Sequence, residues 1–295
     1  MSQILSNKEK NFLHGFYNSV LKCNMFEYNN STDESLYYFC LERCFLNFVV
    51  IRVRNLIPLI LVSIIIPILF INIFKTTPAA KINNREIPIY SVERDDNKIA
   101  ITFDCAWNDD DIDEILNILD NYECKATFFV LGEWAQKYSQ SLIKISERGH
   151  EIGNHSYNHK DYTKMSSKEI KIDLDKCDEI VESLTGKRPR LVRAPSGGYN
   201  DTVIKTCKSR GSIYIQWSVD GIDYGDVRPE DIYTRATHKT ENGDIILLHN
   251  GTEHTAKVLP QILEQLSKNH TFALVSDMIY YDNFIIDHTG RQFVR

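Results

Sequence analysis

From residue 98 onward, short apolar runs alternate with segments whose apolar residues recur every three or four positions. The first kind predicts buried β-strands, and the second predicts amphipathic helices. One helical segment has apolar residues from Ile170 to Leu184 and stops at Gly186 and Pro189, which terminate helices. The alternation is typical of a parallel α/β fold with about seven β/α units. Strands are expected at residues 98–103, 125–131, 151–154, 190–193, 212–217, 244–248 and 271–275, and helices at 112–119, 133–148 and 170–184.

A long apolar run precedes this alternating region. Residues 56–74 carry no charged side chain, and their number is close to the roughly 20 residues that a bilayer-spanning helix needs. A buried core helix would show a polar stripe, which this run lacks, so the run predicts one transmembrane helix. Three arginines lie within residues 43–54, whereas Lys75 and Lys81 follow the run. This difference favours a single-pass protein of the cell membrane whose C-terminal domain lies outside the cytoplasm.

Two alternatives stay open near this run. Residues 77–80 are small residues of the kind that a signal peptidase accepts, and cleavage there would give a secreted protein. Residues 1–55 are expected to form a cytoplasmic segment without recognisable chemistry. They are too long for the basic start of a signal peptide, so translation could instead begin near Val50, with Arg52 and Arg54 as that start. Residues 75–88 are expected to be a linker.

Composition narrows the class of protein. The chain has 295 residues, 43% of them hydrophobic, which is enough for one sizeable globular domain. Its net charge of −6 and the lack of a basic stripe in the sequence argue against nucleic acid binding. Cys124, Cys177 and Cys207 lack the regular spacing of a disulfide-stapled domain and are expected to be buried as small hydrophobic residues. We expect a monomer in which residues 282–295 form a C-terminal tail.

Charged or titratable residues follow several predicted strands. In a barrel of parallel strands, the C-terminal strand ends converge on one face. Residues that are far apart in the sequence can therefore meet in one site. These residues are Asp104, His155, Arg193, Asp223 and His249.

His155 and His159 are the strongest indication of a metal site. They are four residues apart, and neutral imidazoles one helical turn apart can bind one divalent cation from the same side. Surface histidines that cap a helix start are the alternative. The preceding strand and the turn at Gly153-Asn154 favour metal binding.

Together these motifs resemble a known family, the polysaccharide deacetylases of carbohydrate esterase family four, also called the NodB homology domain. The resemblance covers residues 89–281 and implies a distorted (β/α)7 TIM-like barrel. Residues 88–92, ahead of the motif at 103–107, look most like the sporulation-type branch of that family. The matching motifs are Phe103-Asp104-Cys105-Ala106-Trp107, Gly153-Asn154-His155-Ser156-Tyr157-Asn158-His159, Arg193-Ala194-Pro195-Ser196-Gly197-Gly198-Tyr199-Asn200, Asp220-Gly221-Ile222-Asp223-Tyr224 and Ile245-Ile246-Leu247-Leu248-His249.

The resemblance implies a role for each residue of the site. Asp104 would be the general base, and Arg193 would orient it and tune its charge. His155 and His159 would hold a divalent metal, with zinc as the first choice and cobalt or manganese as alternatives. His249 would be the general acid that protonates the leaving amine.

The resemblance also assigns supporting residues. Asp223 would keep His249 charged, and Asp220 is the alternative partner, ranked lower because Asp223 precedes an aromatic residue. The backbone N–H of Tyr199 would stabilise the oxyanion. Trp217, with Trp107, would form either a sugar-stacking wall or part of the core.

Cys105 departs from the family pattern, in which an aspartate follows the base and supplies the third metal ligand. A deprotonated Cys105 thiolate could complete a His2Cys zinc site. Alternatively, Cys105 packs inward and the metal is held by His155, His159 and water, with or without Asp104. The acidic residues 109–111 are expected to begin a helix, although they could also reach the metal.

These observations predict an extracytoplasmic, metal-dependent hydrolase that removes N-acetyl groups from cell-wall polysaccharide, with peptidoglycan amino sugars as the expected substrate. The alternative is a degenerate barrel that binds glycan without hydrolysis. A protein that had lost catalysis would have no reason to keep the costly buried charges of Asp104, Arg193, Asp223 and His249. The enzyme is therefore the favoured hypothesis.

Overall fold

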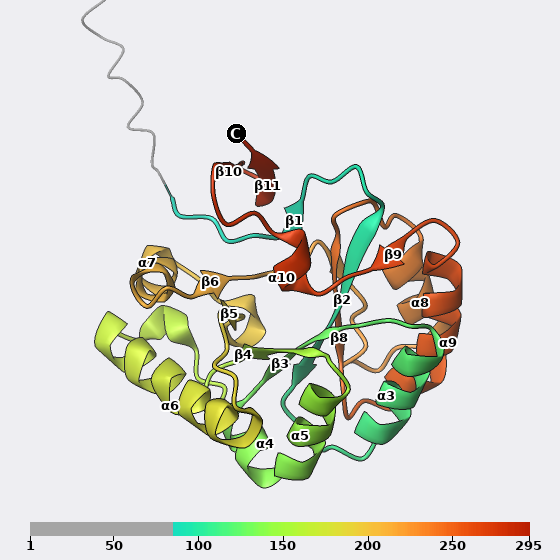
Figure 1. Ribbon diagram of the computed structural model, residues 1–295, viewed down its shortest axis with the longest axis horizontal. Coiled ribbons are helices and arrows are strands. Elements are labelled where there is room, and N and C mark those ends of the chain that lie inside the picture. The colour runs from blue at the N-terminus through green and yellow to red at the C-terminus, as the bar shows by residue number, and fades with distance from the viewer. Residues whose placement is uncertain (1–84) are drawn as a thin grey trace, which may run out of the picture. The chain divides into compact units, whose positions relative to one another are not determined.

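The computed structural model describes residues 85–295 (Figure 1). The predicted cytoplasmic segment, the predicted transmembrane helix at 56–74 and most of the predicted linker lie outside these residues. Within residues 85–295, no helix is long and apolar enough to cross a membrane.

The centre of the fold is an eight-stranded sheet whose strands run in the order β6-β5-β4-β3-β2-β8-β7, with β9 paired to β2. All of these pairs are parallel. β2 pairs with β8 as in a closed barrel, whereas β6 and β7 do not pair with each other. The architecture is therefore an α/β half-barrel. Its strands are β2 (Lys98–Cys105), β3 (Thr127–Val130), β4 (Glu151–Asn154), β5 (Leu191–Val192), β6 (Ile213–Tyr214), β7 (Val219–Asp220), β8 (Ile245–His249) and β9 (Thr271–Phe272).

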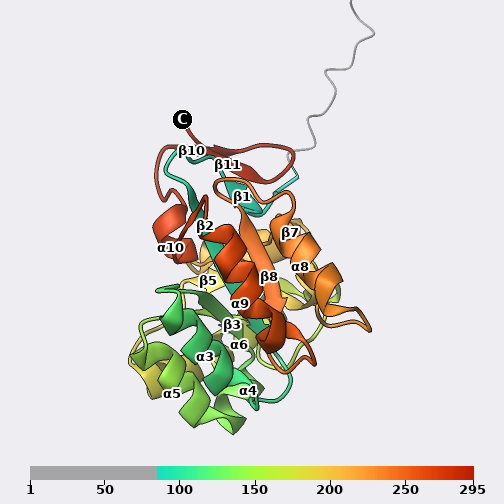
Figure 2. The ribbon, with the colours of Figure 1, turned by 90° about the vertical axis from the view of Figure 1, so that its right-hand side faces the viewer.

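Amphipathic helices cover the outer side of this sheet. In α3, for example, Ile112, Ile115, Leu116 and Leu119 are buried, and they join the large apolar cluster between strands and helices. Figure 2 shows α9 in front of β2 and β8, with α3 near β3 and α5. The helices are α3 (Ile112–Asn121), α4 (Gly132–Lys137), α5 (Ser139–Glu147), α6 (Ser167–Thr185), α7 (Asp201–Ser209), α8 (Pro229–Thr237), α9 (Thr255–Leu266) and α10 (Val275–Met278).

The prediction of a polar C-terminal tail at 282–295 is wrong. β10 (Phe284–Ile286) and β11 (Arg291–Val294) form an antiparallel hairpin, and β11 also pairs with β1 (Ser91–Val92). The fully buried Gln292 holds the hairpin to the preceding segment, because its side chain bonds both the N–H and the carbonyl of Tyr280. Figure 1 shows this small sheet beside the end of the half-barrel where β2 begins.

Two element boundaries also differ from expectation. The single helix predicted at 133–148 is two helices, α4 and α5, separated at Tyr138. The strand predicted at 271–275 keeps only two residues, and Val275 begins α10 instead. In contrast, β4 has the predicted bounds, and the three cysteines 124, 177 and 207 are buried as expected.

Candidate active site

The site begins with the alternation of side chains along β2. Successive residues of a strand point to opposite faces. Phe103 and Cys105 belong to the apolar cluster under the helices, so Thr102 and Asp104 face the inside of the half-barrel. Asp104 is the penultimate residue of β2 and pairs in register with His249 of β8. The predicted base and the predicted acid are thus neighbours across two strands.

Arg193 fixes the position of Asp104. Its guanidinium is fully buried, and one nitrogen (Nη1) donates to Asp104 Oδ1 at 2.8 Å and to Thr102 Oγ1 at 2.8 Å. The other nitrogen (Nη2) donates to the carbonyl of Gln216 at 3.0 Å, and the Phe129 ring lies 4.1 Å from the guanidinium carbon. A buried arginine with this many partners holds the carboxylate in one orientation.

Asp104 is kept ionised by its charged neighbours. Burial alone would raise the pKa of Asp104, but His155, Arg193 and His249 together hold this pKa below its ordinary value. His155 is mostly neutral at pH 7, because burial lowers its own pKa to about 4. At neutral pH, the permanent charge of Arg193 therefore lowers the pKa of Asp104 more dependably than the charge of His155 does.

His155 presents one ring nitrogen to Asp104. Its Nδ1 lies 2.8 Å from the carbonyl of Arg193, which makes Nδ1 the protonated nitrogen. The other nitrogen, Nε2, then carries a free lone pair, and it lies 3.6 Å from Asp104 Oδ2. A neutral imidazole held in this way is suited to ligate a cation.

His159 reaches the site from a loop and not from a helix. Residues 155–159 follow β4 as irregular backbone, so the predicted one-turn helical spacing is wrong. The two histidine rings nevertheless meet, with 5.4 Å between their centroids. Ser156 and His159 have positive φ angles of 81° and 59°, and the His159 N–H donates to Ser156 Oγ at 3.0 Å. Such backbone is unfavourable for these residues and persists only where the surroundings hold it.

The support for this loop comes from α6. Asn154, fully buried at the end of β4, accepts the Ser156 N–H through Oδ1. Its amide nitrogen donates to Asp178 Oδ1 at 2.7 Å and to the carbonyl of Leu174 at 2.9 Å. Asp178 in turn pairs with Arg210.

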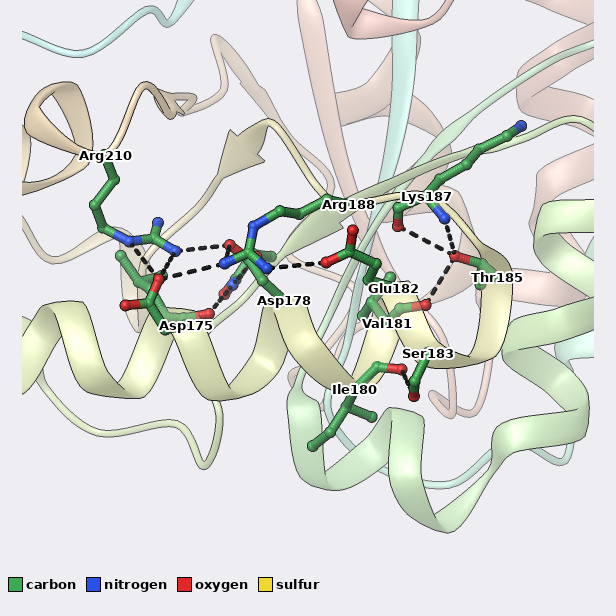
Figure 3. Close-up of polar contacts among 12 residues, drawn as sticks. Asp175, Asp178, Ile180, Val181, Glu182, Ser183, Thr185, Lys187, Arg188 and Arg210 are labelled. Atoms are coloured by element: carbon green, nitrogen blue, oxygen red, sulfur yellow. Dashed lines mark hydrogen bonds and ion pairs between the residues drawn. The ribbon is translucent and has the colours of Figure 1, made fainter.

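Figure 3 shows the surroundings of Asp178, where α6 meets Arg188 and Arg210. A hollow of about 600 Å³ lies beside these residues. It borders Arg190 and Ser212, which directly precede β5 and β6, so it lies at the N-terminal strand ends, away from the histidines. Two of its arginines, Arg188 and Arg210, are already paired with Asp175, Asp178 and Glu182. We therefore do not assign it as the substrate site.

The part-buried His249 and the buried Asp223 form a close pair. His249 Nδ1 lies 2.7 Å from Asp223 Oδ1, and the His249 backbone N–H donates to Asp223 Oδ2 at 2.7 Å. Thr255 Oγ1 also donates to this oxygen. Burial opposes the charged imidazole, but the hydrogen bond and charge of Asp223 outweigh burial and raise the pKa of His249.

Asp220 has a different role from Asp223. Its carboxylate accepts the Ile222 N–H at 2.8 Å and so shapes the turn that leads to Asp223. Asp223 is therefore the direct partner of His249, as predicted. Asp220 contributes to the raised pKa of His249 only through its charge.

Aromatic side chains surround His249 and Arg193. Trp107 and Tyr224 are 48% and 54% exposed, and their ring centroids lie 5.3 and 5.2 Å from the His249 ring. Trp217 instead packs against the inner apolar cluster, 5.4 Å from the Arg193 guanidinium. Of the two predicted wall residues, Trp107 is therefore open to a sugar, whereas Trp217 is mainly structural.

Tyr199 follows the short 3₁₀ turn at Pro195–Gly197 and is part-buried. Its hydroxyl accepts from the Tyr90 hydroxyl at 3.4 Å. Its backbone N–H has no hydrogen-bond acceptor within residues 85–295. A free N–H in this position is compatible with the predicted oxyanion role.

The donors fit a metal site with two histidine ligands, but Cys105 does not complete it. The thiol is buried in the apolar cluster, and burial, with Asp104 and Asp111, raises its pKa well above the ordinary value. Zinc binds the thiolate form, which this environment opposes. In the part of the chain that the structure describes, no group of three His, Cys, Asp or Glu side chains is placed to hold a metal ion. His155 and His159 therefore stay the candidate ligands, and Asp104 Oδ2 lies 3.6 Å from His155 Nε2.

Three supporting residues were missed in the sequence. Thr102 could have been found, because it lies two positions before Asp104 and so shares its face of the strand. Asn154 was read as part of a turn, although its side chain holds the histidine loop. Thr255 is 32 residues from Asp223, and no sequence signal connects the two.

The fold and the site define a class of hydrolase-like α/β half-barrel with a buried carboxylate–arginine pair, two histidines whose pKa values are lowered, and a histidine–carboxylate pair in which the pKa of the histidine is raised. Residues 91–215 match the Polysaccharide deacetylase family. A Peptidoglycan-N-acetylglucosamine deacetylase of Bacillus cereus is 32% identical over 198 residues, which cover 65% of this chain and 92% of that protein. The chain belongs to the polysaccharide deacetylase family.

Two further relatives show the range of this family. The uncharacterised protein YlxY of Bacillus subtilis is 35% identical over 193 residues, 65% of this chain and 60% of YlxY. A CE4 family pseudoenzyme from Bacillus anthracis has a similar structure, with a TM-score of 0.62 and 30% identity over 65% of this chain and 68% of that chain. A mutant of that pseudoenzyme is described as having restored enzymatic activity. Similarity to this family therefore does not by itself establish catalysis.

Proposed function

We propose that this protein is an extracytoplasmic N-deacetylase of cell-wall polysaccharide that hydrolyses the acetamide of peptidoglycan amino sugars with the help of a divalent cation. The observation that carries the proposal is the pairing of Asp104 with His249 across β2 and β8, each held by its own buried partner. The pKa of Asp104 is held below its ordinary value and that of His249 above it, which is the direction that a general base and a general acid require at the same pH.

The chain's own residues account for the proton transfers. Asp104 accepts a proton from the attacking water, whose oxygen bonds to the acetamide carbon. The Tyr199 N–H faces the oxygen that becomes negative. His249 then gives its proton to the nitrogen as the C–N bond breaks, which yields acetate and a free amine. A divalent cation held by His155 and His159 would supply Lewis-acid activation of the carbonyl.

Substrate class and location are part of the proposal. The exposed Trp107 and Tyr224 rings beside His249 suit an apolar sugar face. The B. cereus relative is named a peptidoglycan deacetylase. The apolar run at 56–74 supports membrane attachment and an external domain. The sporulation-type branch and the preference for zinc stay predictions.

The test combines two measurements on the purified full-length chain. Metal content is determined, and acetate release from acetylated peptidoglycan fragments is followed before and after chelation and zinc restoration. We expect chelator-sensitive release that is lost in Asp104→Asn. Absence of release with zinc, cobalt and manganese would contradict the proposal for these substrates.

A second candidate is a glycan-binding protein without hydrolysis. It is favoured by Cys105, which is buried where the resemblance expects a ligand, and by the similarity to a described pseudoenzyme. This candidate predicts saturable binding of peptidoglycan fragments, weakened by Trp107→Ala, with no acetate release under any metal.

A further inference from the structure

A second group of polar residues lies where the loop after β2 meets the loop after β8. Three buried oxygens there have no hydrogen-bond donor within residues 85–295. They are Asn108 Oδ1, Asp111 Oδ1 and Asn250 Oδ1. A buried oxygen without a partner is costly, and three in one place call for a common explanation.

Contacts bring the three residues together. Asn250 is fully buried, and its amide nitrogen donates one hydrogen to the Asn108 carbonyl at 2.5 Å and keeps a second, whereas its oxygen has no partner among the described residues. Asp111 Oδ2 accepts the Gly251 N–H at 2.8 Å, so only Oδ1 is free. The side-chain amide of Asn250 also lies within hydrogen-bonding reach of Asp111.

The side chain of Asn108 lies close against the backbone of Gly251. A Cβ at Gly251 would lie 2.5 Å from Asn108 Oδ1, and the residue has a positive φ of 69°. Only glycine leaves room for this amide oxygen over the backbone. Trp134 closes the group, because its indole N–H donates to the Asn108 carbonyl at 3.0 Å.

We propose that Asn108, Asp111 and Asn250 bind a hard cation of the Ca²⁺ class at this junction, separate from the histidine site. The donors are one carboxylate and two amide oxygens, which are the ligand types of Ca²⁺, whereas zinc prefers nitrogen and sulfur. No lysine, arginine or histidine forms an ion pair with Asp111 among the described residues, so a cation would meet an uncompensated charge. With one carboxylate, affinity in the weak range of extracellular Ca²⁺ modules is expected.

A cation at this junction would connect the loops that follow β2 and β8. Asn108 and Asp111 follow the strand that carries Asp104, and Asn250 follows His249 directly. The cation links the two loops that extend from the base and the acid. The proposal does not depend on deacetylase activity.

The test uses Tb³⁺ as a luminescent substitute for Ca²⁺ on the full-length chain. Trp134 is close enough to sensitise Tb³⁺ emission, so excitation of tryptophan reports on this site. We expect saturable emission that Ca²⁺ displaces. Asp111→Asn should weaken Tb³⁺ binding at least about tenfold, because the only carboxylate is lost. Asp110→Asn, an exposed neighbour, is the matched control and should bind as the parent does.

Thermal unfolding in chelator and in Ca²⁺ separates binding from misfolding. The amide side chain introduced by Asp111→Asn can still accept the Gly251 N–H and can donate to a free amide oxygen. The variant should therefore melt in chelator at least as high as the parent and lose the Ca²⁺-induced rise. Three results would overturn the proposal: no sensitised emission, emission that survives Asp111→Asn, or an equal loss of emission in Asp110→Asn. Water, or a proton on Asp111, would then be the partner of these oxygens.

Discussion

At the scale of single residues, Asp104 and His249 are paired across β2 and β8, and their pKa values are shifted in opposite directions because their buried partners differ. Arg193 stabilises the carboxylate, and Asp223 stabilises the imidazolium. The two pKa values are driven apart, the first below and the second above its ordinary value. A pH range then exists in which both groups are in their working forms, and its alkaline limit is set by His249.

Asp223→Asn should move that alkaline limit. Burial lowers the pKa of His249, and Asp223→Asn removes the two largest contributions that raise this pKa, the hydrogen bond to the carboxylate and its charge. The pKa falls, the acid loses its proton at lower pH, and acetate release at neutral pH drops on the order of 10²-fold. The pH dependence of kcat/KM measures the shift. Asp220→Asn is the matched control, and it should shift the limit less because Asp220 does not touch His249. Equal shifts in both variants would contradict the pairing.

Cys105→Ser tests whether the thiol takes part in metal binding. Because Cys105 is buried in the apolar cluster with a raised pKa, the variant should keep its metal content. Its free energy of unfolding should fall by about 1–3 kcal/mol, since a hydroxyl replaces an apolar contact. Metal analysis and denaturant unfolding give the two values. A loss of bound zinc comparable to that in His155→Ala would instead restore Cys105 as a ligand.

At the scale of elements, the histidine loop depends on β4 and α6. The loop between Asn154 and His159 contains two residues with positive φ, and it is anchored by the Asn154 side chain. Ligand orientation is therefore set by groups that never touch the metal.

Asn154→Ala should weaken metal binding by about 10–100-fold, as expected when an outer partner of a ligand is lost. The Ser156 N–H loses its acceptor, and the loop no longer fixes His155 and His159. Competition with a chelating dye measures the affinity. Asn158→Ala is the control, because Asn158 lies in the same loop and its Oδ1 has no partner among residues 85–295. If both variants bound metal equally weakly, the anchoring role of Asn154 would be wrong.

The sequence predicted most strands of the half-barrel, including the short β4, but missed β7 and the hairpin of β10 and β11. β2 and β8 were found because their buried faces are nearly continuous. β7 has two residues, Val219 and Asp220, and no run to mark it. The site residues were located from their places after strands, but the loop geometry of His159 depends on contacts with α6, which spacing along the chain does not contain.

At the scale of the whole molecule, the two ends of the described chain meet. β1 pairs with β11, and Ser91 also bridges to Asp244, just before β8. This small sheet borders the N-terminal strand ends, whereas the candidate site residues lie at the C-terminal ends. The pairing between β1 and β11 joins residues about 200 positions apart in the sequence, so local patterns could not reveal it.

Gly290→Ala should therefore lower stability without altering the site. Gly290 has a φ of 86°, and a Cβ there would lie 2.2 Å from the Tyr90 ring and 3.0 Å from the Pro88 carbonyl. Backbone strain of about 1 kcal/mol would add to this clash. Gly211→Ala is the matched control, because Gly211 also has a positive φ, 74°, but nothing lies within 4 Å of a Cβ added there.

Denaturant unfolding of both variants separates the effect of backbone strain from that of the clash. Gly290→Ala should lose more stability than Gly211→Ala, while metal affinity per folded molecule stays unchanged. Equal losses would mean that the contact between the hairpin and Tyr90 adds nothing to stability, and a reduced metal affinity in Gly290→Ala would mean that the small sheet and the active site are coupled.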